Sequence, residues 1–172
     1  MNTTIYKLLF FSFILAYCSN AKGQDYKNLV SLKTGVYTGF NYKRLLPNET
    51  AFSAQLGFRD GGITLNAYRT FHQLAFPKKQ NYQLFLFYGY GAHFRYYTRY
   101  KRNNPFKPWR PTNEYRGNYF AAGLDGIIGL EYRFLKYPFV ISTDINPNFE
   151  FGGATAFKVN MDLISIGLGY TF

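Results

Sequence analysis

The last ten residues, Leu163-Ile164-Ser165-Ile166-Gly167-Leu168-Gly169-Tyr170-Thr171-Phe172, decide the fold. From Ile164 onward the even positions are apolar or aromatic, and the odd positions are small or polar. A period of two predicts a β-strand with one apolar face. Such a strand at the end of the chain would leave an open sheet edge, unless the first strand pairs with it. We therefore predict an all-β fold, a transmembrane, antiparallel, up-and-down β-barrel.

The composition agrees with strands that are apolar at alternate positions. The 172 residues suffice for one domain, and 47% of them are hydrophobic, yet the mean hydropathy is −0.23. A helical membrane protein would need apolar runs of about 20 residues. Aromatic residues make up 22% of the chain, as expected for aromatic girdles at two membrane interfaces. A soluble, tyrosine-rich β-sandwich is the alternative.

The formal net charge of +11 first suggests a nucleic-acid partner. The export signal described next argues against nucleic acid, and contact with anionic lipid explains the charge better. The only cysteine, Cys18, lies within that signal. We therefore expect no disulfide, no Cys-based metal or redox site and no cofactor in the mature chain.

Residues 1–23 have the pattern of a secretory signal peptide. Lys7 supplies a positive charge, and residues 8–17 form an apolar stretch too short to span a bilayer. The barrel is therefore expected over residues 24–172.

Two cleavage sites compete in the signal, because residues 19–21 and 21–23 both place small side chains where signal peptidase reads them. Lipidation of Cys18 is a third alternative, disfavoured by the bulky Tyr17 before it.

Eight segments with alternating polarity are separated by turn signals. Their predicted bounds are 28–35, 39–46, 50–59, 63–75, 82–96, 118–134, 139–151 and 157–172. An exported single-chain barrel needs an even number of strands, which requires a turn at residues 35–39. The long loop 98–117 should then lie outside the cell and the short turn 135–138 in the periplasm.

Three positions break the alternation. The apolar parity of the last strand switches at Leu163 and Ile164, which predicts a β-bulge. Arg69 falls on the lipid-facing parity of the fourth strand, a costly position near the middle of a membrane. Pro147 cannot donate a ladder hydrogen bond, so we expect it at a rim or a bulge.

The chain resembles the small eight-stranded barrels of Gram-negative outer membranes, and is OmpX-like in size and layout. It is especially similar to a Bacteroidota family of small outer-membrane proteins with four recurring segments. Here these are Gly129-Leu130-Glu131-Tyr132-Arg133-Phe134, Tyr137-Pro138, Asp144-Ile145-Asn146-Pro147 and Tyr170-Thr171-Phe172. The resemblance implies periplasmic chaperones during biogenesis, and a barrel-assembly machinery that reads Tyr170 and Phe172. It implies no catalytic residues.

Charged residues also occur on the parity that faces the barrel interior. The cations are Lys33, Lys43, Arg59, Arg95 and Arg133, and the anions are Asp125, Glu131 and Asp144. Eight strands enclose a space only wide enough for side chains, and unpaired buried charge is costly. A self-neutralising polar plug is therefore favoured over an ion or small-molecule path.

His72 and His93 are the only histidines. Some outer-membrane barrels modify lipid A with a histidine, a serine and a carboxylate, so an acylase or deacylase is the enzymatic alternative. Neither histidine has an evident Ser and Asp companion at its level of the barrel, and structural roles are favoured. The sequence contains no metal-ligand spacing and no phosphate-binding loop.

The predicted outer loop is strongly basic, with aromatic residues between the cations. Candidate contacts to lipopolysaccharide phosphates are Arg99, Lys101, Arg102, Lys107, Trp109, Arg110 and Arg116. A solvated loop whose charge complements an anionic leaflet is the alternative. We therefore predict a non-enzymatic, monomeric outer-membrane protein with a structural or surface-interaction role.

Overall fold

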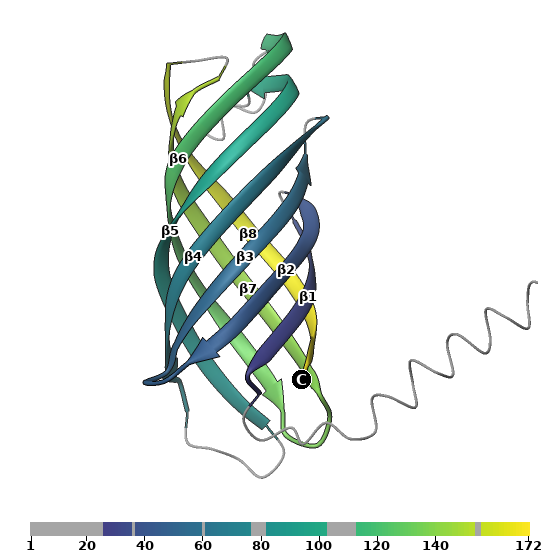
Figure 1. The fold of residues 1–172 in the computed structure, drawn as a ribbon, viewed down its shortest axis with the longest axis vertical. Helices are drawn as coiled ribbons and strands as arrows, with labels where there is room; N and C mark the ends of the chain where they lie inside the picture. The colour runs from purple at the N-terminus through teal and green to yellow at the C-terminus, as the bar shows by residue number, and fades with distance from the viewer. Residues whose placement is uncertain (1–25, 36, 60, 77–81, 103–112, 154–155) are drawn as a thin grey trace, which may run out of the picture.

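The computed structural model describes residues 26–35, 37–59, 61–76, 82–102, 113–153 and 156–172. These residues form one closed antiparallel barrel in which each strand pairs with the next along the chain (Figure 1). The strands are β1 (Asn28–Thr34), β2 (Thr38–Leu46), β3 (Thr50–Arg59), β4 (Gly62–Leu74), β5 (Tyr82–Arg102), β6 (Asn113–Phe134), β7 (Phe139–Gly152) and β8 (Phe157–Thr171). The predicted all-β, eight-stranded, up-and-down architecture is confirmed. The predicted signal peptide and Cys18 lie outside the described residues.

The barrel closes where β8 pairs with β1. Their register runs from Leu29 opposite Thr171 to Thr34 opposite Ile166. The backbone groups of Asn28 and Phe172 exchange two hydrogen bonds of 3.0 Å, which completes the seam. The start of β1 and the end of β8 therefore lie at the same end of the barrel, the lower end in Figure 1. The alternating residues at the end of the chain therefore pair with the first strand, as predicted.

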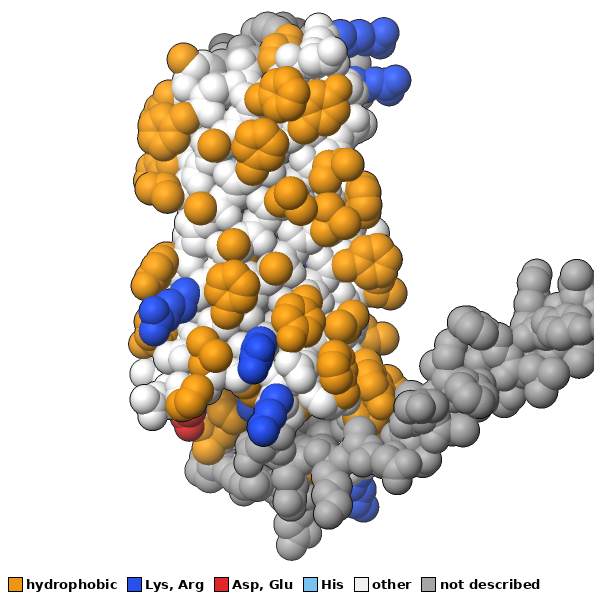
Figure 2. Space-filling model, in the orientation of Figure 1, with side chains coloured by type: hydrophobic (Ala, Val, Ile, Leu, Met, Phe, Trp, Pro, Cys, Tyr) orange, Lys and Arg blue, Asp and Glu red, His pale blue; other side chains and the backbone are white. Residues whose placement is uncertain are grey.

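Side chains alternate between the two surfaces of the sheet. Large hydrophobic side chains are exposed on the outside, where they spread over the visible face (Figure 2), and polar side chains are buried inside. Outward examples from different strands are Leu32, Phe40, Leu65, Leu124 and Leu168. A water-soluble barrel would place apolar groups inside instead. In the described residues there is no helix long and apolar enough to cross a membrane.

The fifth and sixth strands are longer than predicted. β5 has 21 residues and β6 has 22, and their paired ends extend above β1 to β4 at the upper end of the barrel (Figure 1). The predicted loop 98–117 is thus wrong in extent, because pairing resumes at Arg99 opposite Arg116 after a register shift and continues to Arg102 opposite Asn113. The sequence hides this extension, since residues 98–102 are mostly polar on both parities and show no apolar period of two.

The predicted bulge in β8 is confirmed. Leu163 and Ile164 together oppose Ile145 of β7, and the register shifts at this point. Ile164 has a φ of 47°, which is uncommon for a β-branched residue. The extra residue reverses the parity of the strand, so exposed apolar residues stay outside both above and below it.

The prediction for Pro147 also agrees with the structure. The paired residues of β6 and β7 skip from Asp125 opposite Asn148 to Ile128 opposite Ile145. Pro147 lies within this gap and beside the bulge, where no ladder hydrogen bond from its nitrogen is required.

Candidate functional site

The barrel interior is a continuous arrangement of polar side chains that bond to one another. Seven of the eight predicted interior residues are buried there, namely Lys33, Lys43, Arg95, Asp125, Glu131, Arg133 and Asp144. The eighth, Arg59, is half-exposed at the upper end of β3. We describe three groups, ordered from the end where β1 begins and β8 ends: the lower, middle and upper clusters.

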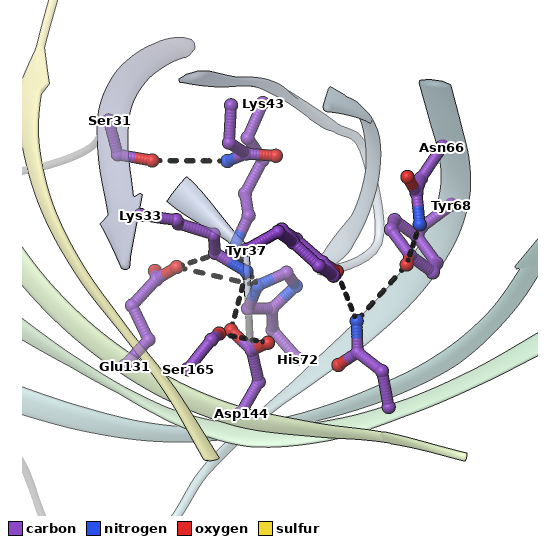
Figure 3. Close-up of polar contacts among 12 residues, drawn as sticks. Ser31, Lys33, Tyr37, Lys43, Asn66, Tyr68, His72, Glu131, Asp144 and Ser165 are labelled. Atoms are coloured by element: carbon purple, nitrogen blue, oxygen red, sulfur yellow. Dashed lines mark hydrogen bonds and ion pairs between the residues drawn. The ribbon is translucent and has the colours of Figure 1, made fainter. Parts of the chain in front are cut away.

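The lower cluster is built around Glu131 of β6, whose side chain is 0% exposed. Its Oε2 atom lies 2.6 Å from Lys43 Nζ. Its Oε1 atom accepts hydrogen bonds from the Tyr26 hydroxyl and from Arg133 Nε, both at 2.7 Å. His72 Nε2 is 3.4 Å from Lys43 Nζ, so it lies at the edge of this group (Figure 3). One carboxylate thus neutralises two cations that come from different strands.

Aromatic rings cover the two cations of the lower cluster. The Arg133 guanidinium lies 3.9 Å from the centre of the Phe85 ring and 4.7 Å from that of Tyr26. Lys43 Nζ lies 4.5 Å from the centre of the Phe87 ring. A cation over an aromatic face gains about 0.5–2 kcal/mol, with the larger values at desolvated sites. These rings therefore stabilise charge as well as filling the lumen.

The middle cluster joins β1, β7 and β8. Lys33 Nζ lies 2.5 Å from Asp144 Oδ2, and the Ser165 hydroxyl donates to Asp144 Oδ1 at 2.6 Å (Figure 3). The Asn146 amide, with its nitrogen 3.0 Å from Asp144 Oδ1, extends the group toward the other side of the barrel. Asp144 therefore anchors side chains from both strands of the closing seam.

Two tyrosines bring the opposite wall into contact with the middle cluster. The Tyr37 and Tyr68 hydroxyls lie 3.2 and 3.1 Å from the Asn146 amide, and Asn66 donates to the Tyr68 hydroxyl at 2.7 Å. Tyr37 belongs to the turn between β1 and β2, which folds its side chain into the lumen. These contacts connect opposite walls of the barrel across the lumen.

The interior also contains a small apolar layer that the sequence analysis did not predict. Tyr68, Phe87 and Ile127 pack together, and each is at most 6% exposed. A neighbouring enclosed space has a volume of about 10 Å³, with Lys33 and Lys43 among its lining residues. That volume accommodates about one water molecule. Around these residues the lumen is packed with side chains.

The upper cluster is centred on Glu150 of β7, which is 0% exposed. Its Oε2 atom lies 3.0 Å from Arg95 Nη1 and 3.5 Å from His93 Nε2, and its Oε1 atom lies 2.9 Å from Lys158 Nζ. His93 Nδ1 lies 2.8 Å from Asp125 Oδ1. A single carboxylate again gathers cationic groups from several strands.

The upper cluster adds carboxylates to the surroundings of His93 and adds two residues to the interior set. His93 was expected to have no evident Ser and Asp companion at its level, and the structure places the carboxylates of Asp125 and Glu150 beside it. Glu150 and Lys158 were missing from the predicted interior set. Glu150 lies on the inward-facing parity of β7, so the sequence could have revealed it. Lys158 is assigned to the inside only if the bulge, which reverses the alternation of β8, is taken into account.

The basic residues of the predicted outer loop divide into two groups. Arg99 and Arg116 are exposed and lie directly opposite each other on β5 and β6. Lys101 and Arg102 continue β5. Lys107, Trp109 and Arg110 lie outside the described residues.

The terminal aromatic residues lie at the lower rim. Phe172 is exposed, and the Tyr170 ring packs edge-on against Phe139 with 6.0 Å between ring centres. Within the described ranges, no group of three or more His, Cys, Asp or Glu side chains is placed to hold a metal ion.

Known proteins share the fold with this chain. The N-terminal β-barrel domain of Pseudomonas aeruginosa OprF superposes with a TM-score of 0.50 and 12% sequence identity. The aligned region covers 87% of this chain and all of that domain. The likeness shows a shared barrel fold. Models of protein families and curated proteins give no match. The OmpX-like layout and the Bacteroidota family therefore stay predictions.

Proposed function

We propose that this chain is an integral, non-enzymatic protein of the bacterial outer membrane, exported by a cleaved signal peptide and inserted as a monomer. One observation carries the proposal: a closed sheet with hydrophobic side chains outside and paired charges inside. Closure satisfies the backbone hydrogen bonds that hydrocarbon cannot satisfy. The lower rim, with both strand termini, is assigned to the periplasm. Chaperones and the assembly machinery would deliver the chain, with Tyr170 and Phe172 as the recognised end.

The first test is whether the protein inserts into membranes without conducting ions. We expect the purified protein to need detergent, to show heat-modifiable gel mobility, and to give no discrete conductance in planar lipid bilayers. The packed clusters around Glu131 and Asp144 leave little space for ions, which supports this expectation. Recovery as a water-soluble protein would refute the membrane assignment. Discrete channel openings would refute the plug and favour the narrow channel instead.

The upper hairpin supplies the surface for interaction. Arg99 and Arg116 are exposed cross-strand neighbours, so both guanidinium groups belong to the same part of the hairpin. Guanidinium groups bind phosphates through two hydrogen bonds. We infer that this pair contacts the phosphates of lipopolysaccharide, and Lys101, Arg102, Lys107, Trp109 and Arg110 remain further candidate contacts from the sequence.

Replacing both arginines should weaken lipopolysaccharide binding. We expect the variant R99Q/R116Q to bind purified lipopolysaccharide at least tenfold more weakly, because two charge-assisted contacts are lost. Binding to the protein in detergent micelles can be measured by microscale thermophoresis. The control is K136Q, which removes an exposed cation from the turn at the lower end. Equal affinities for the two variants would show that the paired arginines have no specific part in binding.

The lipid A-modifying enzyme is tested separately. Mass spectrometry of lipid A from cells with and without the gene should give the same acyl and phosphate pattern. A changed pattern would refute the non-enzymatic role, and an H93N variant would then show whether the upper cluster is required.

A further inference from the structure

The outer surface of β2 to β5 contains an apolar groove. Its volume is about 600 Å³. The floor consists of three alanines, Ala54, Ala67 and Ala92, which are direct cross-strand neighbours on β3, β4 and β5. Their small side chains leave a hollow in a surface that is otherwise covered by large hydrophobic groups. This groove faces the proposed hydrocarbon region.

The groove has an apolar wall on its upper side. The next outward residue of each strand forms this row, in which cross-strand neighbours are again in register: Phe40, Leu56, Leu65 and Phe94. Tyr42 and Val30 border the groove toward β1. A lining of this kind suits a hydrocarbon chain better than a polar ligand.

Two arginines lie on the lower side of the same groove. Arg44 follows Tyr42 by one outward position and Arg69 follows Ala67 likewise, with Phe52 as the direct neighbour of both arginines. Both are exposed on the outside, and neither forms an ion pair with a described carboxylate. Figure 2 shows Lys and Arg side chains among hydrophobic ones on the lower half of this face.

The depth of these arginines points to lipid headgroups. An Arg on the lipid face costs about 2–4 kcal/mol at the membrane midplane and about 0–1 near an interface. Tyr90 lies directly opposite Arg69, and the Tyr42 hydroxyl is bonded to Asn28 near the start of β1. Tyrosines gather where hydrocarbon meets headgroups. The arginine row is therefore placed at the level of lipid phosphates.

We propose that Arg44, Arg69 and the alanine groove form a binding site for an anionic glycerophospholipid of the periplasmic leaflet. The two arginines flank one strand, so their backbones are about 10 Å apart, within reach of one phosphate for two long side chains. The phosphate lies between the guanidinium groups, and one acyl chain runs up the groove toward the membrane centre. A lipid of the periplasmic leaflet has this orientation, with its phosphate on the lower side and its acyl chain directed upward. The site rests on the proposed insertion of the barrel in the membrane.

The site can be tested by lipid retention. The probe is phosphatidylglycerol, mixed in equal amount with phosphatidylcholine in detergent micelles, and bound lipids are counted by native mass spectrometry. We expect the wild type to retain phosphatidylglycerol selectively. R44Q/R69Q should retain at least fivefold less, and A67F, which fills the groove without changing charge, should also lose selective retention.

Matched controls separate this site from general effects. K136Q removes an exposed cation from the turn between β6 and β7, and L168F enlarges an outward apolar residue on β8. Both should retain lipid as the wild type does. Heat-modifiable mobility of every variant reports insertion independently, so a misfolded barrel is distinguished from an intact barrel without the site.

Three results would overturn the inference. Unchanged retention of phosphatidylglycerol by R44Q/R69Q would exclude a role of the arginines in lipid binding. Unchanged retention by A67F would exclude a role of the groove. A mass corresponding to two barrels, lost in A67F, would show that a second copy of the chain occupies the groove instead of lipid.

Discussion

The variant E131Q should unfold at a markedly lower urea concentration than the wild type. The Glu131 carboxylate is completely buried and accepts contacts from Tyr26, Lys43 and Arg133. Removing its charge leaves two buried cations without their counter-ion. Breaking a buried ion pair in this way costs about 3–5 kcal/mol. The measurement is a urea titration of the barrel in lipid vesicles, followed by circular dichroism and gel mobility.

Two further variants test the cause of that loss. E49Q changes an exposed carboxylate in the turn between β2 and β3 and should be close to neutral. The triple variant K43M/E131L/R133M replaces the charged group by apolar side chains and should recover most of the lost stability, since such replacements are often neutral. If the triple variant is as unstable as E131Q, the loss arises from packing and not from unpaired charge.

The second large effect is expected at the closing seam, for G169V. A Cβ atom on Gly169 would lie 2.5 Å from Leu29 Cδ1 and 2.9 Å from Ser31 Cβ, so β1 would have to shift away from β8. Overpacking of this kind costs about 1–3 kcal/mol. We expect a lower unfolding midpoint and a smaller fraction of heat-modifiable protein after refolding into detergent.

The adjacent residue provides the control for the seam. Leu168 is 59% exposed on the outside, so L168V changes an apolar side chain without crowding β1. Equal midpoints for G169V and L168V would show that the seam tolerates a side chain at this position.

The sequence predicted what depends on local alternation. Strand bounds agreed with the structure to within one residue at most ends, because a sheet with one lipid-facing surface enforces a period of two. The bulge was predictable for the same reason, since the parity switch at Leu163 and Ile164 has no other simple explanation. The extension of β5 and β6 was missed because its residues are mostly polar on both parities and show no apolar period of two.

Features that depend on the register between distant strands could not be predicted. The contact of Glu150 with Arg95 and Lys158 requires knowing how far the strands stagger around the barrel. The register that places Arg44 and Arg69 on either side of Phe52 could not be predicted for the same reason. Phe87 was missed for another reason: its inward position contradicts the simple rule of polar residues inside.

The interior ion pairs determine how the stability of the barrel responds to salt in the medium. Dissolved salt screens charges at a protein surface over about 8–10 Å, but it screens buried pairs much less. The pairs of Glu131 with Lys43 and of Asp144 with Lys33 are sealed from the medium by the barrel wall. The contribution of these two ion pairs to the stability of the barrel should therefore change little with the salt concentration of the medium.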